Sequence, residues 1–241
     1  MKVTTAGMTD VGCVRRLNED RLGMFPGLNL YIVADGMGGH AAGEVASKMA
    51  VESMEAFFSS PDVTEQALDM KLVQAINYAN QKIHDAGEKD PALNGMGTTV
   101  VAVVAQTDET IIAYVGDSRV YLFRDNRIVQ LTQDHSLVNE YIRKGLLTPE
   151  AALHHPLKHV ISRALGTGPT VEAETIRRPP VSGDIFLLCS DGLSNKLSPE
   201  EMRAILTATQ GNLEKAGSAL IDKAKEKGGE DNITVVLIGY Q

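Results

Sequence analysis

The chain has 241 residues, enough for one large domain or two small ones, and we expect a single domain over 1–241. Hydrophobic residues make up 43% of the sequence and charged residues 22%, which excludes a disordered or fibrous chain. The formal net charge of -8 argues against a general nucleic-acid binder and against a protein held on an anionic membrane.

No targeting or membrane-spanning signal is visible in the sequence. The first ten residues contain no apolar stretch of signal-peptide length, and no run approaches the ~20 apolar residues that span a bilayer. Cys13 and Cys189 are too few for a disulfide framework, so we expect both to be reduced thiols in the core. These features predict a cytoplasmic protein, and the strand-like final residues predict no tail or second module after them.

Strands and then helices are predicted for the first half of the chain. Short strands open it at 2–11, 21–25 and 30–34, where apolar residues alternate or run together. The period then changes, because apolar residues recur every three or four positions in 39–59 and 64–87 and predict two consecutive amphipathic helices. Four strands follow between 98 and 132, and their short linkers predict one antiparallel meander.

The second half begins with a weakly apolar, histidine-containing stretch at 136–165, which we expect to form short helices and a lid. The remaining elements are strands at 171–177, 184–189 and 232–239 and helices at 199–208 and 212–227. Blocks of antiparallel strands interrupted by pairs of helices predict an α+β layered sandwich with the helices outside. A doubly wound parallel sheet is the alternative.

Four aspartates lie at the ends of predicted strands. Asp35, Asp117 and Asp191 follow apolar runs, and Asp231 precedes the last strand. An Asp after one strand is ordinarily part of a turn, but four buried strands could bring four such residues together at one edge of the core. Clustered carboxylates either share protons or bind hard cations. Without an organised set of Cys and His, Mg²⁺ or Mn²⁺ is favoured over Zn²⁺.

An anion-binding group is predicted near the N-terminus, where Arg15 and Arg16 precede Glu19 and Asp20. The guanidinium group presents a planar set of donors that fits a phosphate through two hydrogen bonds. An exposed cluster of ion pairs is the alternative interpretation. Carboxylates that bind metal beside an arginine that binds phosphate indicate a phosphoester hydrolase.

The segment GMGGHAAG at 36–43 supplies the main competing function, because its glycine spacing imitates a dinucleotide-binding fingerprint. A nucleotide-binding oxidoreductase needs a strand directly after the first helix, whereas a second helix at 64–87 follows here. The sequence also lacks the P-loop motif GxxxxGK[ST], which excludes a P-loop nucleotide-binding protein. Among the six histidines, His40 flanks the glycine turn and Asp35, which makes it the candidate for a contact with the substrate phosphate.

Seven segments together resemble the metal-dependent serine/threonine protein phosphatases of type 2C in their short bacterial form. In family order they are TDVGCVRRLNED, VADGMGGHAAGEVAS, MGTTVVA, AYVGDSRVYLFRD, TQDHSLV, CSDGLSN and GGEDNITVVLI. The resemblance covers essentially the whole chain. It implies a four-layer αββα sandwich of two antiparallel sheets flanked by helix pairs, with a two-metal centre at one end and a small flap subdomain at about 136–165.

The resemblance also implies a set of metal ligands. Asp35 resembles the carboxylate that bridges both metals, with the Gly36 carbonyl on one metal and Asp191 and Asp231 on the other. Asp20 resembles an outer ligand that acts largely through water.

Further roles follow from the same resemblance. Asp117, together with Asp191, matches a third metal site of bacterial members, so two to three divalent cations, Mn²⁺ or Mg²⁺, are implied. Arg15 matches the phosphate-binding arginine. Animal-type members have His where this chain has Met37, which leaves His40 or a metal-bound water to protonate the leaving group.

The function implied is a protein serine/threonine phosphatase in which water held between two cations attacks phosphorus directly, without a phosphoenzyme. Its expected partners are phosphoserine and phosphothreonine proteins and a cognate serine/threonine kinase, with no nucleic acid and no membrane. We expect a cytoplasmic monomer. A phosphatase of an anti-sigma-factor antagonist pathway and a non-catalytic member of the fold are the alternatives, and retention of every predicted metal position argues against the second.

Overall fold

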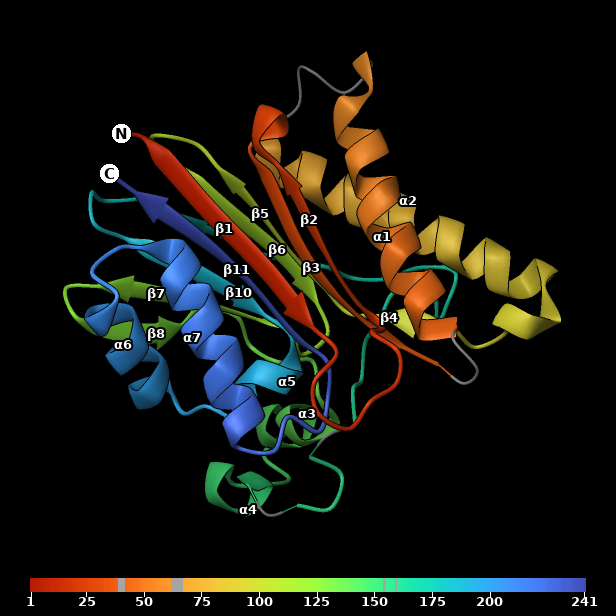
Figure 1. Cartoon of the computed structure of the whole chain (residues 1–241). Coiled ribbons are helices and arrows are strands. Elements are labelled where there is room, and N and C mark those ends of the chain that lie inside the picture. The colour runs from red at the N-terminus through yellow and green to blue at the C-terminus, as the bar shows by residue number, and fades with distance from the viewer. Residues whose placement is uncertain (39–41, 62–66, 154, 159) are drawn as a thin grey trace.

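Two antiparallel sheets pack face to face in the computed structural model, which describes residues 1–38, 42–61, 67–153, 155–158 and 160–241 (Figure 1). In spatial order the first sheet contains β1 (Val3–Asp10), β11 (Ile233–Tyr240), β10 (Ile185–Cys189), β7 (Arg119–Arg124) and β8 (Arg127–Gln130). The second sheet contains β2 (Asp20–Phe25), β3 (Leu30–Met37), β5 (Val100–Ala105), β6 (Thr110–Val115) and β9 (Glu174–Arg178), with β4 (Gly97–Thr98) paired to β3.

Helices cover the outer face of each sheet. The second sheet is covered by α1 (Ala42–Ser59) and α2 (Leu68–Lys89), and the first by α5 (Asp191–Ser194), α6 (Pro199–Ala208) and α7 (Leu213–Glu226) (Figure 1). The expected four-layer αββα sandwich is therefore confirmed. The doubly wound alternative is wrong, because every strand pair among the described residues is antiparallel.

Three apolar layers hold the sandwich together, and single strands contribute to two of them. In β3, Ile32 and Ala34 face the helices, whereas Tyr31 and Val33 face the other sheet and pack in the layer that contains Phe186. Successive side chains of a strand point to opposite faces, so a strand buried on both faces is apolar throughout. This explains why the strands read as continuous apolar runs in the sequence.

The predicted long helices agree with the structure within the described residues, whereas the predicted helix starts at 39 and 64 lie outside them. The apolar residues of α2 that recur at intervals of three and four are buried: Leu72, Ala75, Ile76, Ala79 and Ile83. In α6 a capping box fixes the start, since the Ser198 hydroxyl accepts from the Glu201 backbone N–H and the Glu201 carboxylate accepts from the Ser198 backbone N–H. No helix in the described ranges combines the length and apolarity that a membrane crossing requires.

The predicted meander between 98 and 132 is wrong at its centre. β5 pairs with β6 and β7 pairs with β8, but β6 and β7 lie in different sheets. The chain crosses between the sheets at Gly116, whose φ of +105° suits glycine, and a Cβ at Gly116 would lie 2.6 Å from Thr99 Cγ2. The short linker thus turns the chain from one layer to the other, and Asp117 lies at the crossing.

Other expectations need smaller corrections. Asp35 lies inside β3 and not at its tip, because β3 continues to Met37 and pairs there with β4. β4 and α5 have two and four residues, too few to produce a periodic signal, and were not predicted. Cys189 is a buried free thiol as expected, whereas Cys13 is free but exposed.

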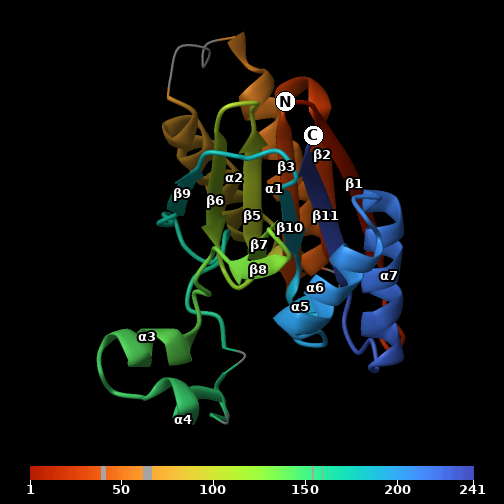
Figure 2. The same cartoon turned by 90° about the vertical axis from the view of Figure 1, so that its left-hand side faces the viewer.

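The segment 136–165 projects from the sandwich and contains α3 (Leu137–Arg143) and α4 (Pro149–Leu153) (Figure 2). Its two ends are joined at the base, where the Ser162 N–H donates to the His135 carbonyl at 2.8 Å and Ser136 bridges Ile161. We call this segment the flap. It is attached to the core through His135, a buried ring that stacks on Tyr114 with centroids 5.2 Å apart.

We predict that Gly116→Ala destabilises the fold more than a matched glycine substitution elsewhere. The new Cβ would both strain the backbone and meet Thr99, costing about 3 kcal/mol. Gly183→Ala is the control, because its φ of +95° is similar and nothing lies within 4 Å, so about 1 kcal/mol is expected. Equal losses in denaturant unfolding would contradict the close contact at the crossing.

Candidate metal centre

A pocket of 260 Å³ opens where the two sheets meet at one end of the sandwich. Its lining contains most of the predicted site residues: Arg15, Glu19, Asp35, Gly36, Met37, Gly38, Asp117, Ile161, Asp191, Asp231 and Asn232. Asp20 lies behind this lining and is only 3% exposed. His40 falls outside the described residues. A larger hollow beside β1 contains none of the predicted residues, so the chemistry belongs to the smaller pocket.

Each carboxylate comes from a different element. Asp20 begins β2 and stands opposite Asp35 in the ladder between β2 and β3. Asp117 lies at the crossing between the sheets, Asp191 is the first residue of α5, and Asp231 precedes β11. The sheets therefore contribute to the cluster from both sides, which is why residues more than 200 positions apart in the sequence meet here.

Burial and mutual repulsion dominate the electrostatics of the pocket. Burial raises the pKa of Asp35 well above its usual range, and the charges of the other four carboxylates raise it further. Asp35 is half-buried and lines the pocket. The other four carboxyl groups are thus close enough to act on Asp35.

Two of these carboxylates leave an oxygen without a hydrogen-bond partner. Burial and the charges of Asp191 and Asp231 raise the pKa of Asp20 to about 7, although the Ser190 hydroxyl donates to Asp20 Oδ2 at 2.7 Å. Burial and, after it, the negative charge of Asp191 raise the pKa of Asp117 to about 7. The Oδ1 atoms of Asp20 and Asp117 are buried and unpartnered. An unpaired buried carboxylate oxygen is costly unless a cation meets it.

The donor set fits hard divalent cations. Carboxylate and carbonyl oxygens are the ligands of Mg²⁺ and Mn²⁺, and no Cys or His lines the described pocket. Among the described residues no three His, Cys, Asp or Glu side chains converge tightly on one point. The carboxylates instead surround a common space, as expected of like charges that repel.

Arg15 lies at the rim of the pocket and reaches the carboxylate cluster from the loop 11–19. Its Nη2 donates to Asp231 Oδ2 at 2.9 Å. Both side chains are more than two-fifths exposed, so this pair contributes little to stability. Its position places a guanidinium group beside the proposed metal ligands, as the sequence predicts.

Asn232 is a positioning residue that sequence reasoning missed. Its buried side chain accepts from the Glu19 N–H at 2.8 Å and donates to the Val11 and Leu17 carbonyls at 2.9 Å each. These three bonds fasten the loop that carries Arg15 to the residue next to Asp231. A polar residue directly before an apolar strand was the available signal.

The MGTT segment has a positioning role that was also missed. Thr99 Oγ1 accepts from the Asp35 N–H at 3.1 Å and shares a 2.7 Å hydrogen bond with Ser118 Oγ. Thr98 Oγ1 donates to the Asp35 carbonyl at 2.9 Å. The backbone of the central carboxylate is therefore held from β4 and from the crossing that carries Asp117.

We predict that Mn²⁺ stabilises the protein more at about pH 7.5 than at about pH 5. The pKa values of Asp20 and Asp117 are raised from 3.8 to about 7, so the folded state holds protons that the unfolded state releases, and metal-free stability falls as pH rises between about 4 and 7. A cation replaces those protons. Melting temperatures with EDTA and with Mn²⁺ measure the effect, and an equal Mn²⁺ shift at both pH values would contradict it.

Comparison with known proteins agrees with this geometry. The family model for protein phosphatase 2C matches residues 16–225. The serine/threonine phosphatase stp of Listeria welshimeri is 44% identical over 235 residues, covering 95% of this chain and 93% of the relative. The solved serine/threonine phosphatase of S. agalactiae covers 100% of both chains at 36% identity and a TM-score of 0.91. The catalytic domain of the phosphatase PstP, solved with two manganese ions, matches at 38% identity and a TM-score of 0.84, covering 98% of this chain and 97% of that one. This chain therefore belongs to the protein phosphatase 2C family and is a phosphoprotein phosphatase.

Proposed function

We propose that the chain is a Mn²⁺- or Mg²⁺-dependent phosphatase that hydrolyses phosphoserine and phosphothreonine in proteins by direct attack of water on phosphorus. The observation that carries this proposal is the cluster of five carboxylates around one pocket, two of them with unpartnered buried oxygens. Family membership and a relative solved with two manganese ions support the metal dependence.

Two to three cations would be held by the predicted ligands: Asp35, the Gly36 carbonyl, Asp191 and Asp231, with Asp117 at a third site and Asp20 acting through water. When bound, these cations supply an activated water at neutral pH and offset charge on the phosphoryl oxygens. A side chain at Gly36 is excluded, because a Cβ there would lie 2.0 Å from the Gly43 carbonyl oxygen. The backbone can therefore approach the site closely at this position.

Arg15 would bind the phosphate. A guanidinium group has five N–H donors, and the contact with Asp231 uses Nη2, so further donors are left for two phosphoryl oxygens. Asn232 orients this arginine indirectly, since it fixes both ends of the loop around it. The arginine thus orients the phosphoryl group toward the carboxylate cluster.

Direct hydrolysis is supported by what lines the pocket. No Ser, Thr, Cys or His side chain among the described lining residues is placed to form a phosphoenzyme, and the lining aspartates that could form one are the proposed metal ligands. Met37 lines the pocket and has no proton to donate to the leaving oxygen. Protonation by His40 stays a prediction.

We further propose that 1–241 acts as one catalytic unit, a monomer in the cytoplasm, that opposes a serine/threonine kinase. The flap belongs to this unit because Ile161, at its base, lines the pocket. An anti-sigma-factor antagonist is the alternative substrate, and comparing phosphoproteins in cells with and without the active enzyme distinguishes the two.

We predict that hydrolysis of p-nitrophenyl phosphate requires added Mn²⁺ and stops with EDTA. Asp35→Asn should lower kcat at least about a hundredfold, because it removes the central charge of the cluster. Initial rates over a Mn²⁺ series measure both effects. Full activity in excess EDTA would exclude the metal mechanism, and wild-type activity of Asp35→Asn would exclude this pocket.

We predict that Arg15→Ala raises KM about tenfold or more and leaves the bound metal unchanged, because it removes charge-assisted hydrogen bonds to the phosphate. Arg16→Ala is the matched control, since Arg16 does not line the pocket, and it should leave KM for p-nitrophenyl phosphate unchanged. Kinetics and metal analysis of both variants test the assignment. Loss of bound metal from Arg15→Ala would refute it.

A further inference from the structure

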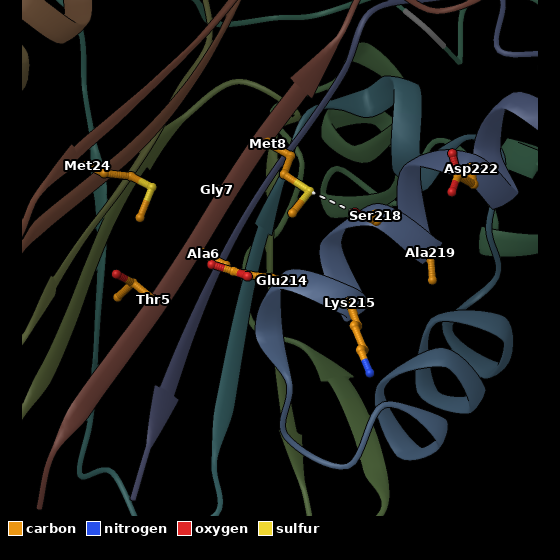
Figure 3. A pocket seen from close by; sticks show the side chains of 10 residues that line it. All are labelled: Thr5, Ala6, Gly7, Met8, Met24, Glu214, Lys215, Ser218, Ala219 and Asp222. Carbon is orange, nitrogen blue, oxygen red and sulfur yellow. Dashed lines mark hydrogen bonds between the residues drawn. The ribbon is translucent and has the colours of Figure 1, made fainter.

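A hollow of 760 Å³ lies beside β1, away from the carboxylate pocket, and we call it the β1 groove. Residues Thr5–Met8 of β1 form its floor, Met24 of β2 lies on one side, and Ser218 and Ala219 of α7 lie on the other (Figure 3). Its volume lies within the range of ligand sites in proteins. Met8 and Met24 give it flexible apolar contacts that tolerate different partner side chains.

The floor of the β1 groove is an open sheet edge. β1 is the terminal strand of its sheet and pairs only with β11 among the described strands. Lys2 and Gln241 exchange both backbone hydrogen bonds, at 2.7 and 2.9 Å, so the even-numbered residues of β1 bond to β11. The N–H and C=O groups of Thr5, Gly7 and Thr9 therefore point away from β11, where an added strand can use them.

The β1 groove continues toward the catalytic pocket. A second hollow, of 680 Å³, shares Gly7 and Met8 with it and is lined farther on by Arg16 and Asn18. These two residues belong to the loop 11–19, which carries Arg15 to the pocket. An extended chain on β1 would thus reach the loop from which the phosphate-binding arginine extends.

The end of this path near the pocket carries charges of both signs, because it is lined by Arg16, Arg21, Asp20 and Glu44. Arg16 makes no ion pair within the described ranges, and the nearest carboxylate partner of Arg21 is Glu44 at 4.0 Å. Asp20 is buried and Arg21 faces Glu44, so the exposed Arg16 is the charge that remains to attract an anionic segment. A phosphorylated peptide supplies an anion, and the path leads to the pocket in which its phosphate would react.

We propose that the β1 groove docks the substrate protein, as an extended segment that adds an antiparallel strand to β1. β1 runs toward the loop 11–19, so an antiparallel segment places the residues that follow the phosphorylated one in the groove, while the phosphate reaches Arg15. Docking of this kind rests on the proposed function. The proposal implies that the substrates are proteins whose phosphorylated residue is followed by an unstructured C-terminal flank.

Three phosphothreonine peptides test the proposal on the full chain with Mn²⁺. One is short, one carries a C-terminal extension of about nine residues, enough to span β1 at ~3.4 Å per residue, and one carries the same extension on the N-terminal side. The C-terminally extended peptide should show a kcat/KM about tenfold above that of the short one, through a lower KM. The N-terminal extension should give no gain.

Two variants of the groove wall and one control complete the test. Ala219→Trp and Ser218→Trp fill the groove from α7, and each should abolish the gain while leaving rates on the short peptide and on p-nitrophenyl phosphate unchanged. Glu226→Trp places the same side chain on α7 outside the groove and should keep the gain. Thermal melting verifies that each variant is folded.

The outcomes separate docking from catalysis. Three outcomes would overturn docking and leave the phosphatase assignment intact. The first is hydrolysis of all three peptides at equal kcat/KM, and the second is a gain in kcat/KM for the N-terminal extension alone. The third is a gain for the C-terminal extension that survives both groove variants. A dimer in light scattering that both groove variants dissociate would assign the groove to a second copy and also overturn docking. No Mn²⁺-dependent hydrolysis of any substrate would overturn both proposals.

Discussion

Five carboxyl groups that repel one another around a single pocket are the constraint on which the structure depends. Their assembly costs electrostatic free energy, as the raised pKa values of Asp20, Asp35 and Asp117 show. The free energy that offsets this cost comes from elsewhere, mainly from the apolar layer between the two sheets, where side chains such as Val33 and Phe186 are fully buried. The carboxylate cluster keeps its structure because the apolar layers of the sandwich stabilise the fold around it.

Neutral hydrogen-bonding groups, more than ion pairs, hold the cluster in place. Thr98 and Thr99 fix the backbone of Asp35, Ser190 fixes the carboxylate of Asp20, and Asn232 fixes the loop of Arg15. Neutral groups hold these residues without cancelling the charge of the carboxylates, so the negative potential remains available to a cation. The ion pair between Arg15 and Asp231 is at the exposed rim, where exchange of the carboxylate for a phosphate costs little.

The sequence predicts the long elements and the carboxylates well, because buried strands and amphipathic helices have strong local patterns. It fails where the outcome depends on contacts distant in the chain. A three-residue linker after β6 is compatible with a hairpin, and only the packing around Gly116 directs β7 into the other sheet. The positions of Asp20, Asp35 and Asp231 follow from the family motifs, whereas the role of Asn232 depends on three partners in a loop more than 200 residues away.

The attachment of the flap has a consequence for how the protein can diverge. The segment leaves and re-enters the sandwich at neighbouring points, with Ser136 bridged to Ile161, so its length and composition can change with little effect on the ladders of either sheet. The flap is therefore an exchangeable insert on a fixed core. Because its base forms part of the pocket wall, an insert that is free to vary adjoins the reaction site, and new substrate preferences can arise there without a redesign of the metal ligands.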